Sequence, residues 1–371
     1  MIPESRDSQD NRHHPSRRDA LHSAGDLIRT LAQIGIQCSL GGLALRTLFT
    51  PAQLWALERP LNHDQEAEAP VTPRQGETPV DLYRLPQTVI PSRYDLRLEP
   101  DLAQATFAGS ETIEMTVRES VNTVMLNAAE LQITEAVITD EEGRPVQATI
   151  ELDAATDRCL LTFPETLKPG HWRLRIVFTG ILNAKLRGFY RSTYKDAQGQ
   201  EKVLAATQFE ATDARRAFPC WDEPAFKAVF STTLAIDPTL KAVSNTVALS
   251  EHVVNGKKII RFKDTIAMST YLVAFVVGDL EASPPVAIGT TPLRIWTTPG
   301  KAHLTEFGLE IAAASLRFFE DYYGIPYPSD KLDLLAIPDF ASGAMENLGA
   351  ITFRETALLV DPHTSTHAER E

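Results

Sequence analysis

Alternating hydrophobic and polar positions dominate residues 93–278 of the chain. The clearest runs are Tyr94, Leu96 and Leu98, then Ile113, Met115 and Val117, then Trp172, Leu174, Ile176 and Phe178. Period-two alternation interrupted by turn residues is typical of half-buried antiparallel strands. The pattern therefore predicts an all-β domain of roughly a dozen antiparallel strands.

The dipeptide Asn255-Gly256 marks one connection in this region. It separates two strand-like runs, residues 252–254 and 257–262. Asn-Gly readily adopts the positive φ angles of a type I′ turn, so the sequence predicts a β-hairpin with its tip at these two residues.

The pattern changes after Pro284-Pro285, and we predict that a mixed α/β domain begins near Ala287. Strands are predicted at residues 293–297, 332–337 and 350–353, with a loop over residues 338–347. Between the first two strands, apolar residues recur at helical spacing: Leu304, Phe307, Ile311, Phe318, Phe319 and Tyr322. Gly324 is the expected C-terminal cap. We expect the aromatic stripe of this helix to pack into the core rather than to hold a cofactor.

Residues 1–80 differ in composition from the rest. Residues 1–19 and 59–79 are polar and are predicted to be disordered, and residues 21–57 can form a short amphipathic helix. Arg17-Arg18 resembles a twin-arginine export signal, although charged and amide residues interrupt the apolar run that follows. A flexible leader and a weak export signal both remain open, and a cytoplasmic location is expected. No stretch approaches the ~20 apolar residues that span a bilayer.

Composition narrows the classes of function. The 371 residues are 43% hydrophobic and 23% charged, as in globular proteins, with a net charge of −13. This charge argues against a nucleic-acid partner, which requires a basic face. The three cysteines, Cys38, Cys159 and Cys220, are far apart and odd in number. They predict neither a disulfide framework nor a metal pair, and we expect buried thiols.

Three motifs carry the functional signal. They are RGFYRSTY from Arg187, QFEATDARRAFPCWDEP from Gln208 and GAMENLGAITFRE from Gly343. Together, and in this order, they resemble the aminopeptidase N family of zinc aminopeptidases, which includes puromycin-sensitive aminopeptidase and leukotriene A4 hydrolase. The resemblance covers about residues 84–371 and the N-terminal portion of the family. It implies a saddle-like, mainly β domain of antiparallel sheets over residues 81–286. The start of a thermolysin-like α/β catalytic domain would follow, over residues 287–371.

The resemblance also implies which residues bind substrate. An exopeptidase that removes N-terminal residues must bind a free α-ammonium group, and charge-assisted hydrogen bonds to carboxylates do this best. By resemblance, Glu346 and Glu210 bind the amine and Gln208 forms a polar wall. Because strand side chains alternate, Gln208 and Glu210 are expected on one face of an extended segment.

The rest of the loop that begins at Gly343 has implied roles as well. The resemblance implies that the main chain of Gly343 and Ala344 pairs with the substrate, that Met345 borders the first side-chain pocket and that Asn347 fixes the loop. The charged residues after Glu210 are interpreted as structural ion pairs at the domain junction: Asp213, Arg215, Arg216, Asp222 and Glu223.

Zinc catalysis in the family needs His-Glu-x-x-His, whose histidines bind zinc and whose Glu activates water. These 371 residues do not contain it. His363 and His367 have the spacing, but Thr366 stands where the base is needed. Thr366 and Glu369 form a capping box that predicts a helix starting near His367, which leaves His363 outside it. We therefore expect zinc in the complete family enzyme, no ligands for it here, and a chain that lacks a C-terminal portion and is inactive alone.

Two functions remain as hypotheses. The first is the N-terminal portion of a zinc aminopeptidase whose partners are peptides with a free N-terminus. The alternative is a non-catalytic peptide-binding or scaffold protein on a degenerate aminopeptidase fold. The presence of both Glu210 and Glu346 favours the first, because a scaffold has no need of an amine pocket.

Overall fold

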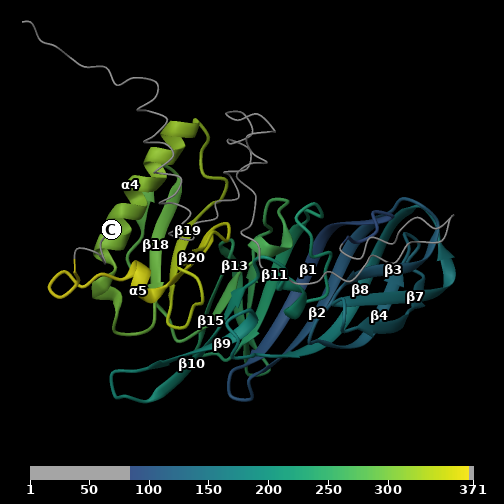
Figure 1. The fold of residues 1–371 in the computed structure, drawn as a ribbon, viewed down its shortest axis with the longest axis horizontal. Coiled ribbons are helices and arrows are strands. Elements are labelled where there is room, and N and C mark those ends of the chain that lie inside the picture. The colour runs from purple at the N-terminus through teal and green to yellow at the C-terminus, as the bar shows by residue number, and fades with distance from the viewer. Residues whose placement is uncertain (1–83, 367–371) are drawn as a thin grey trace, which may run out of the picture. The chain divides into compact units, whose positions relative to one another are not determined.

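The computed structural model describes residues 84–366, which lie in one compact unit, Pro79–Glu371. The expected leader, export signal and helix within residues 1–80 fall outside the described residues, as does the helix expected from His367. The described chain forms a β-rich domain followed by a smaller α/β region (Figure 1). This order agrees with the architecture expected from the sequence.

An eight-stranded sheet is the largest element of the β-rich domain. Its strand order is β13 (Ala248–Val254), β14 (Lys257–Phe262), β11 (Val229–Ile236), β1 (Val89–Asp101), β2 (Thr106–Val117), β8 (Gly170–Ile181), β4 (Gln132–Thr139) and β5 (Pro145–Gln147). The three alternating runs lie on β1, β2 and β8, and all of their apolar members except the half-buried Trp172 are at most 1% exposed. The alternation thus identified the core face of this sheet.

One pairing in this sheet corrects the expectation of purely antiparallel strands. β1 and β11 run parallel, from Arg93 opposite Val229 to Leu98 opposite Leu234. Alternation reports which face of a strand is buried but not the direction of its neighbour. The hairpin prediction, which depends only on local sequence, is confirmed: Asn255 and Gly256 have φ angles of 50° and 76° between β13 and β14.

Two smaller sheets complete the β-rich domain. One has the order β3 (Val121–Asn127), β7 (Arg158–Leu167) and β6 (Thr149–Asp153). The other has the order β12 (Lys241–Ser244), β15 (Phe275–Gly278), β10 (Glu201–Gln208) and β9 (Gly188–Lys195). The second sheet matters for function, because β9 carries the first sequence motif and β10 ends at Gln208.

The α/β region is built on a fourth sheet. Its strand order is β16 (Glu281–Ala282), β18 (Thr291–Thr297), β19 (Leu332–Ile337), β21 (Ala350–Arg354) and β20 (Ala344–Met345), and β17 (Val286–Ile288) also pairs with β18. The strands predicted at residues 293–297, 332–337 and 350–353 are confirmed. The sheet starts slightly earlier than Ala287, at Glu281. The predicted loop over residues 338–347 contains the short strand β20, which is too brief for a sequence pattern to reveal.

Helix α4 (Glu306–Tyr323) packs beside β17 and β18. It ends as predicted at Gly324, which has a φ of 66° and whose N–H bonds to the carbonyl of Glu320 at 2.9 Å. A shorter helix, α5 (Glu355–Leu358), follows β21, and three 3₁₀ turns occur elsewhere: Ala214–Arg216, Thr270–Leu272 and Ala302–Leu304. In the described part of the chain, no helix is both long and apolar enough to cross a membrane.

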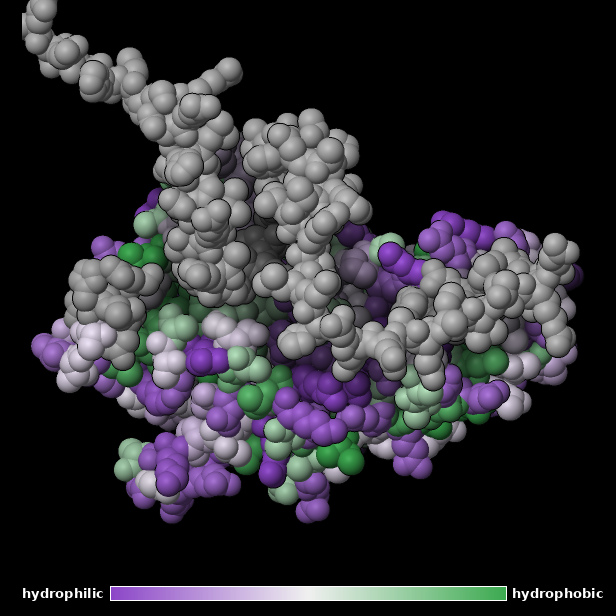
Figure 2. Space-filling view, viewed as in Figure 1, coloured by the Kyte–Doolittle hydropathy of each residue, from purple (hydrophilic) through white to green (hydrophobic). Residues whose placement is uncertain are grey.

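The aromatic stripe of α4 contradicts the expectation of core packing. The helix buries Gly308, Ala313 and Leu316, whereas Phe318 and Tyr322 are 60% and 70% exposed. The exposed rings stack on one another, with 5.7 Å between the centroids of Phe318 and Tyr322. Apolar residues therefore reach the surface in the region of α4 (Figure 2). Helical periodicity indicates that a helix has an apolar face, but it does not identify what covers that face.

Candidate functional site

The loop that begins at Gly343 lies at the end of the α/β sheet and is held by Arg354. Arg354 donates from its main-chain N–H to the carbonyl of Gly343 at 2.9 Å. Its guanidinium donates to the carbonyls of Phe340 and Ala341 at 3.0 and 2.5 Å. Arg354 belongs to the same sequence motif as the loop. These contacts fix the start of the loop against β21.

Asn347 and Gly349 fix the other end of the loop. Asn347 is buried, and its side-chain amide donates to the Thr352 hydroxyl at 3.1 Å. Gly349 has a φ of 74°, and a Cβ there would lie 2.0 Å from the carbonyl oxygen of Asn245, so only glycine fits. Asn347 thus connects the loop to β21, and the loop-fixing role that the resemblance implied stays a prediction.

Two contacts tie this loop region to the β-rich domain. The side chain of Asn245 donates to the carbonyls of Leu272 and Leu348 at 2.8 and 2.9 Å and accepts from the N–H of Ala274. This amide therefore links the segment after Asn347 to strand β15 and the turn before it. Sequence reasoning did not single out Asn245, which has no recognisable motif.

Asp339 makes the second link, to strand β9. Its carboxylate accepts from the main-chain N–H and the hydroxyl of Thr193 at 2.7 and 3.1 Å. Its own N–H donates to the Ser192 hydroxyl, and its carbonyl accepts from the Tyr190 hydroxyl at 2.8 Å. Residues of the RGFYRSTY motif on β9 thus hold Asp339 and, with it, the segment that leads into the loop. Its role at the junction follows from these bonds rather than from its sequence.

The strand β20 presents an unpaired edge within the described sheet. It lies at the end of the strand order and pairs only with β21, Ala344 opposite Phe353 and Met345 opposite Thr352. The carbonyl of Gly343 is already bonded to Arg354. Because main-chain groups alternate sides along a strand, the N–H and carbonyl of Ala344 face the open edge. Met345 is 1% exposed and packs in a core cluster with Tyr190, so its side chain points inward.

Gln208 and Glu210 do not share one extended strand, contrary to expectation. Strand β10 ends at Gln208, and Glu210 lies in the turn that follows, where the N–H of Asp213 bonds to the carbonyl of Phe209 at 2.8 Å. The Glu210–Ala211 peptide bond is cis. Gln208 is 8% exposed, and among described residues its Oε1 has no hydrogen-bond partner. Glu210 is exposed, so a buried acceptor and an exposed carboxylate lie two residues apart.

Glu210 and Glu346 interact electrostatically although 136 positions separate them along the chain. The pKa of Glu210 is raised, first because partial burial disfavours its charged form and then because the charge of Glu346 repels it. The charge of Glu346 therefore acts on Glu210 through space, which places the two carboxylates in the same region of the described chain. Both are exposed. Two adjacent carboxylates and the unpartnered Gln208 oxygen make an acceptor-rich site suited to a cation that donates several hydrogen bonds.

The charged residues after Glu210 form ion pairs, but not at the junction with the α/β region. Arg215 bonds to the buried Asp222 at 3.0 Å, and Asp222 also accepts from Thr270 at 2.7 Å. The other pairs are Arg215 with Asp157, Arg216 with Asp213, Glu130 and Asp157, and Arg84 with Glu223. All of these partners belong to the β-rich domain. The structural interpretation is supported, and the location is corrected from the domain junction to the β-rich domain itself.

Neither described cysteine has the surroundings of a nucleophile. Cys159 and Cys220 are buried free thiols. Burial raises the pKa of Cys159 to about 12 and that of Cys220 well above its usual range. Thiolates are the reactive species, so these side chains act as core residues. Cys38 lies outside the described residues.

Residues 84–366 contain no group of three or more His, Cys, Asp or Glu that could hold a metal. His363 is exposed in a turn, where its N–H bonds to the Asp361 carboxylate at 2.8 Å. His367 lies outside the described residues. The described side chains therefore do not fit a zinc ion.

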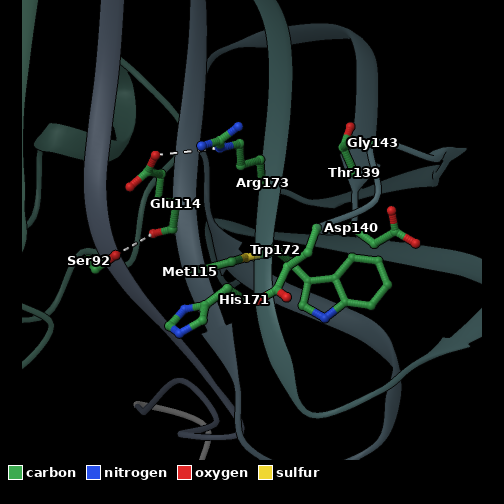
Figure 3. A pocket seen from close by; sticks show the side chains of 10 residues that line it. Ser92, Glu114, Met115, Thr139, Asp140, Gly143, His171, Trp172 and Arg173 are labelled. Atoms are coloured by element: carbon green, nitrogen blue, oxygen red, sulfur yellow. Dashed lines mark hydrogen bonds and ion pairs between the residues drawn. The ribbon is translucent and has the colours of Figure 1, made fainter.

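A separate cavity of about 420 Å³ lies on the eight-stranded sheet, around Trp172 (Figure 3). Three of its charged lining residues, Glu114, Asp140 and Arg173, are in ion pairs. Glu114 pairs with Arg173 at 3.5 Å, and Asp140 pairs with Arg144 at 2.7 Å. Neither Glu210 nor Glu346 lines it. We assign no function to this cavity.

This order of β-rich domain and α/β region agrees with the outcome of comparison with known proteins. The Peptidase M1 N-terminal domain matches residues 90–272, and the Peptidase family M1 domain matches residues 307–371. The chain belongs to the M1 peptidase family.

Three relatives illustrate the match. The chain is 41% identical over 292 residues to Aminopeptidase M1 of Arabidopsis thaliana, covering 78% of this chain and 33% of that protein. It is 40% identical over 297 residues to Puromycin-sensitive aminopeptidase of Caenorhabditis elegans, covering 78% and 31%. It is 37% identical over 312 residues to Endoplasmic reticulum aminopeptidase 1 of Rattus norvegicus, covering 83% and 34%. The chain thus spans about a third of the length of these curated relatives.

Proposed function

We propose that this chain is the substrate-amine-binding portion of an M1 aminopeptidase. In this proposal Glu210 and Glu346 bind the α-ammonium group of a peptide, and Gln208 contributes a third acceptor through its Oε1. The observation that carries the proposal is the raised pKa of Glu210, which results first from partial burial and then from repulsion by the charge of Glu346. A bound ammonium removes that repulsion, because a positive charge between two carboxylates favours their ionised forms.

The unpaired edge of β20 supports the same proposal. A peptide whose amine lies between the two carboxylates can run beside β20 and pair with the main-chain groups of Ala344. Such strand addition supplies affinity from the main chain without regard to side-chain identity. A Cβ built on Gly343 meets no atom within 4 Å, so the space beside the loop is open in the described chain. Met345 and Asn347 act in this proposal by holding the loop rather than by touching the amine.

Hydrolysis is a separate matter from binding. We propose that the complete enzyme removes N-terminal residues from peptides and that the 371-residue chain binds amines without cleaving them. The motif that would bind zinc and activate water is not in this sequence. The cytoplasm remains the expected compartment.

Calorimetric titration at pH 7 with Leu-Gly-Gly and with N-acetyl-Leu-Gly-Gly tests the proposal. We expect saturable binding of the free peptide and binding at least ~10-fold weaker after acetylation, equivalent to about 1.4 kcal/mol, because acetylation removes the cation. Equal binding of both peptides would support the alternative of a peptide-binding scaffold without amine recognition. If neither peptide binds, both the amine-binding proposal and the scaffold alternative are contradicted.

A further inference from the structure

A second cavity, of about 430 Å³, lies where the β-rich domain meets the α/β sheet. Its walls come from β12, the β13–β14 hairpin, β18 and β19. Its charged lining residues are four cations and two carboxylates: Lys241, Lys258, Arg294, Lys331, Glu251 and Asp333. The cavity is therefore electropositive, in contrast to the acidic site around Glu210.

Two of the four cations are committed to partners. Lys331 is buried, bonds to the Asp333 carboxylate at 2.7 Å and donates to the Gly349 carbonyl at 2.6 Å. Lys258 donates to the Leu240 carbonyl at 2.7 Å and pairs with Glu251 at 3.4 Å. The two carboxylates of the cavity are thus largely used in balancing Lys331 and Lys258.

The other two cations keep donors free for a ligand. Lys241 has a neutral partner, the Leu280 carbonyl at 2.6 Å, which leaves its charge unbalanced. Arg294 lies 3.5 Å from Asp333, measured from its Nε, and shares that carboxylate with Lys331. The terminal nitrogens of its guanidinium make no hydrogen bond to any residue from 84 to 366, and the side chain is 35% exposed. An arginine fork left open in a cavity is the group that binds a planar or tetrahedral anion bidentately.

The pKa of Lys331 reflects both its burial and the positive charge of the cavity. Burial lowers the pKa of Lys331, and the charge of Arg294 acts in the same direction, against the effect of Asp333. Positive charges therefore repel one another here, and an anion would relieve that repulsion.

Val243, Ile260 and Phe262, all buried, line the cavity beside the charges. These side chains offer an apolar wall to the body of a ligand.

We propose that this cavity binds a small anion that carries a phosphate or carboxylate group on an apolar body. Arg294 and Lys241 bind the anionic group, and the apolar wall contacts the rest of the ligand. Neither Glu210 nor Glu346 lines the cavity. The inference thus stands independently of amine binding.

Phenyl phosphate, benzoate and phenol are suitable probes, titrated into the full 371-residue chain by calorimetry at low salt. We expect saturable one-to-one binding of at least one of the two anions and none of phenol, because phenol lacks the charge. Phenyl phosphate binding more tightly than benzoate would assign the site to phosphates, and the reverse would assign it to carboxylates. Absence of saturable binding of both anions would overturn the proposal.

Variants locate the site. Arg294→Gln is expected to weaken anion binding at least ~10-fold, since a bidentate charged contact is lost, and Lys241→Gln to weaken it less. Lys185→Gln is the matched control: Lys185 is an exposed lysine that pairs with Glu130 outside the cavity, so this variant should bind like the wild type. If Arg294→Gln fails to fold, as judged by circular dichroism, the exposed Lys241→Gln carries the test. Equal losses in Lys241→Gln and Lys185→Gln would overturn the assignment.

Discussion

Beyond the effect of partial burial, the charge of Glu346 raises the pKa of Glu210, although Glu346 follows a strand of the α/β sheet and Glu210 follows a strand of the β-rich domain. Two parts of the chain thus contribute one carboxylate each to a common site. The hydrogen bonds of Asn245 and Asp339 across the junction hold these parts together. The account of function depends on this relationship.

Replacement of Glu346 should change the titration of its neighbour. In Glu346→Gln the pKa of Glu210 is expected to fall towards its usual range without reaching it, because repulsion disappears while burial remains. Carboxyl ¹³C NMR titration measures this. Glu306→Gln, which removes a charge from the first turn of α4, is the control and should leave Glu210 unchanged. An unaltered pKa in Glu346→Gln would show that the carboxylates do not interact.

The same shift predicts how amine binding depends on pH. Glu210 binds an ammonium only when ionised, and its raised pKa extends the protonated form to higher pH. Binding of Leu-Gly-Gly should therefore weaken as pH falls through the raised pKa of Glu210. In Glu346→Gln this loss should begin at a lower pH, although binding is weaker throughout. Calorimetry from pH 4 to pH 8 would record both curves, and affinity independent of pH would contradict the role of Glu210.

Glu111, in the middle of strand β2, is expected to reduce stability at neutral pH. It is 2% exposed, neither carboxyl oxygen has a partner among described residues, and burial raises its pKa well above the usual range. Its folded pKa exceeds its unfolded pKa, so stability is full below the unfolded value and is lost as pH rises towards the folded value. Glu111→Leu should stabilise the fold by about 1–3 kcal/mol at pH 7, the cost of an unpaired buried polar group.

Urea unfolding at pH 5 and pH 8 would test this prediction. The increase in the free energy of unfolding caused by Glu111→Leu should be greater at pH 8. At that pH the wild type loses stability because the unfolded state ionises Glu111 more readily than the folded state does. Glu114→Gln changes an exposed carboxylate on the same strand and should have little effect at either pH. Destabilisation by Glu111→Leu at both pH values would mean that the carboxyl has a stabilising partner.

Asn245→Ala should loosen the loop that begins at Gly343. The substitution removes hydrogen bonds to Leu272, Ala274 and Leu348 and leaves buried groups unpaired, at a cost of about 2 kcal/mol. Hydrogen exchange of residues 343–349 should accelerate, because Leu348 loses its attachment to the β-rich domain. Asn183→Ala, which alters a loop within that domain, is the control. Unchanged exchange of the loop in Asn245→Ala would show that the junction is held elsewhere.

Sequence patterns predicted the local features of the fold well. The hairpin at Asn255-Gly256 and the cap at Gly324 depend on backbone preferences of one or two residues, and both formed as expected. The parallel pairing of β1 with β11 could not be predicted, since alternation carries no information about distant partners. For the same reason the helical pattern of α4 predicted an apolar face but wrongly assigned it to the core.

The candidate site was predictable in its residues but not in its geometry. The motifs identified Glu210 and Glu346 through resemblance, whereas the turn at Glu210 and the inward side chain of Met345 required the structure. Asn245 has no motif, because its role arises from three main-chain groups that come together only in the fold.

The 371-residue chain is expected to cleave no aminoacyl reporter substrate, with or without added zinc. Binding of an amine does not activate water, and the His-Glu-x-x-His sequence that would do so in the family is not among these residues. A fluorogenic leucine substrate provides the assay. Turnover that a chelator abolishes would contradict the expectation.

The most direct test of the account is a double-mutant comparison of amine binding. Affinities for Leu-Gly-Gly and N-acetyl-Leu-Gly-Gly would be measured by calorimetry in the wild type, Glu210→Gln, Glu346→Gln and the double variant. We predict that each single variant weakens binding of the free peptide at least ~10-fold, as expected when a charge-assisted hydrogen bond is lost. The double variant should no longer distinguish the two peptides. Unchanged preference for the free amine in the double variant would contradict the assignment of Glu210 and Glu346 as the amine-binding site.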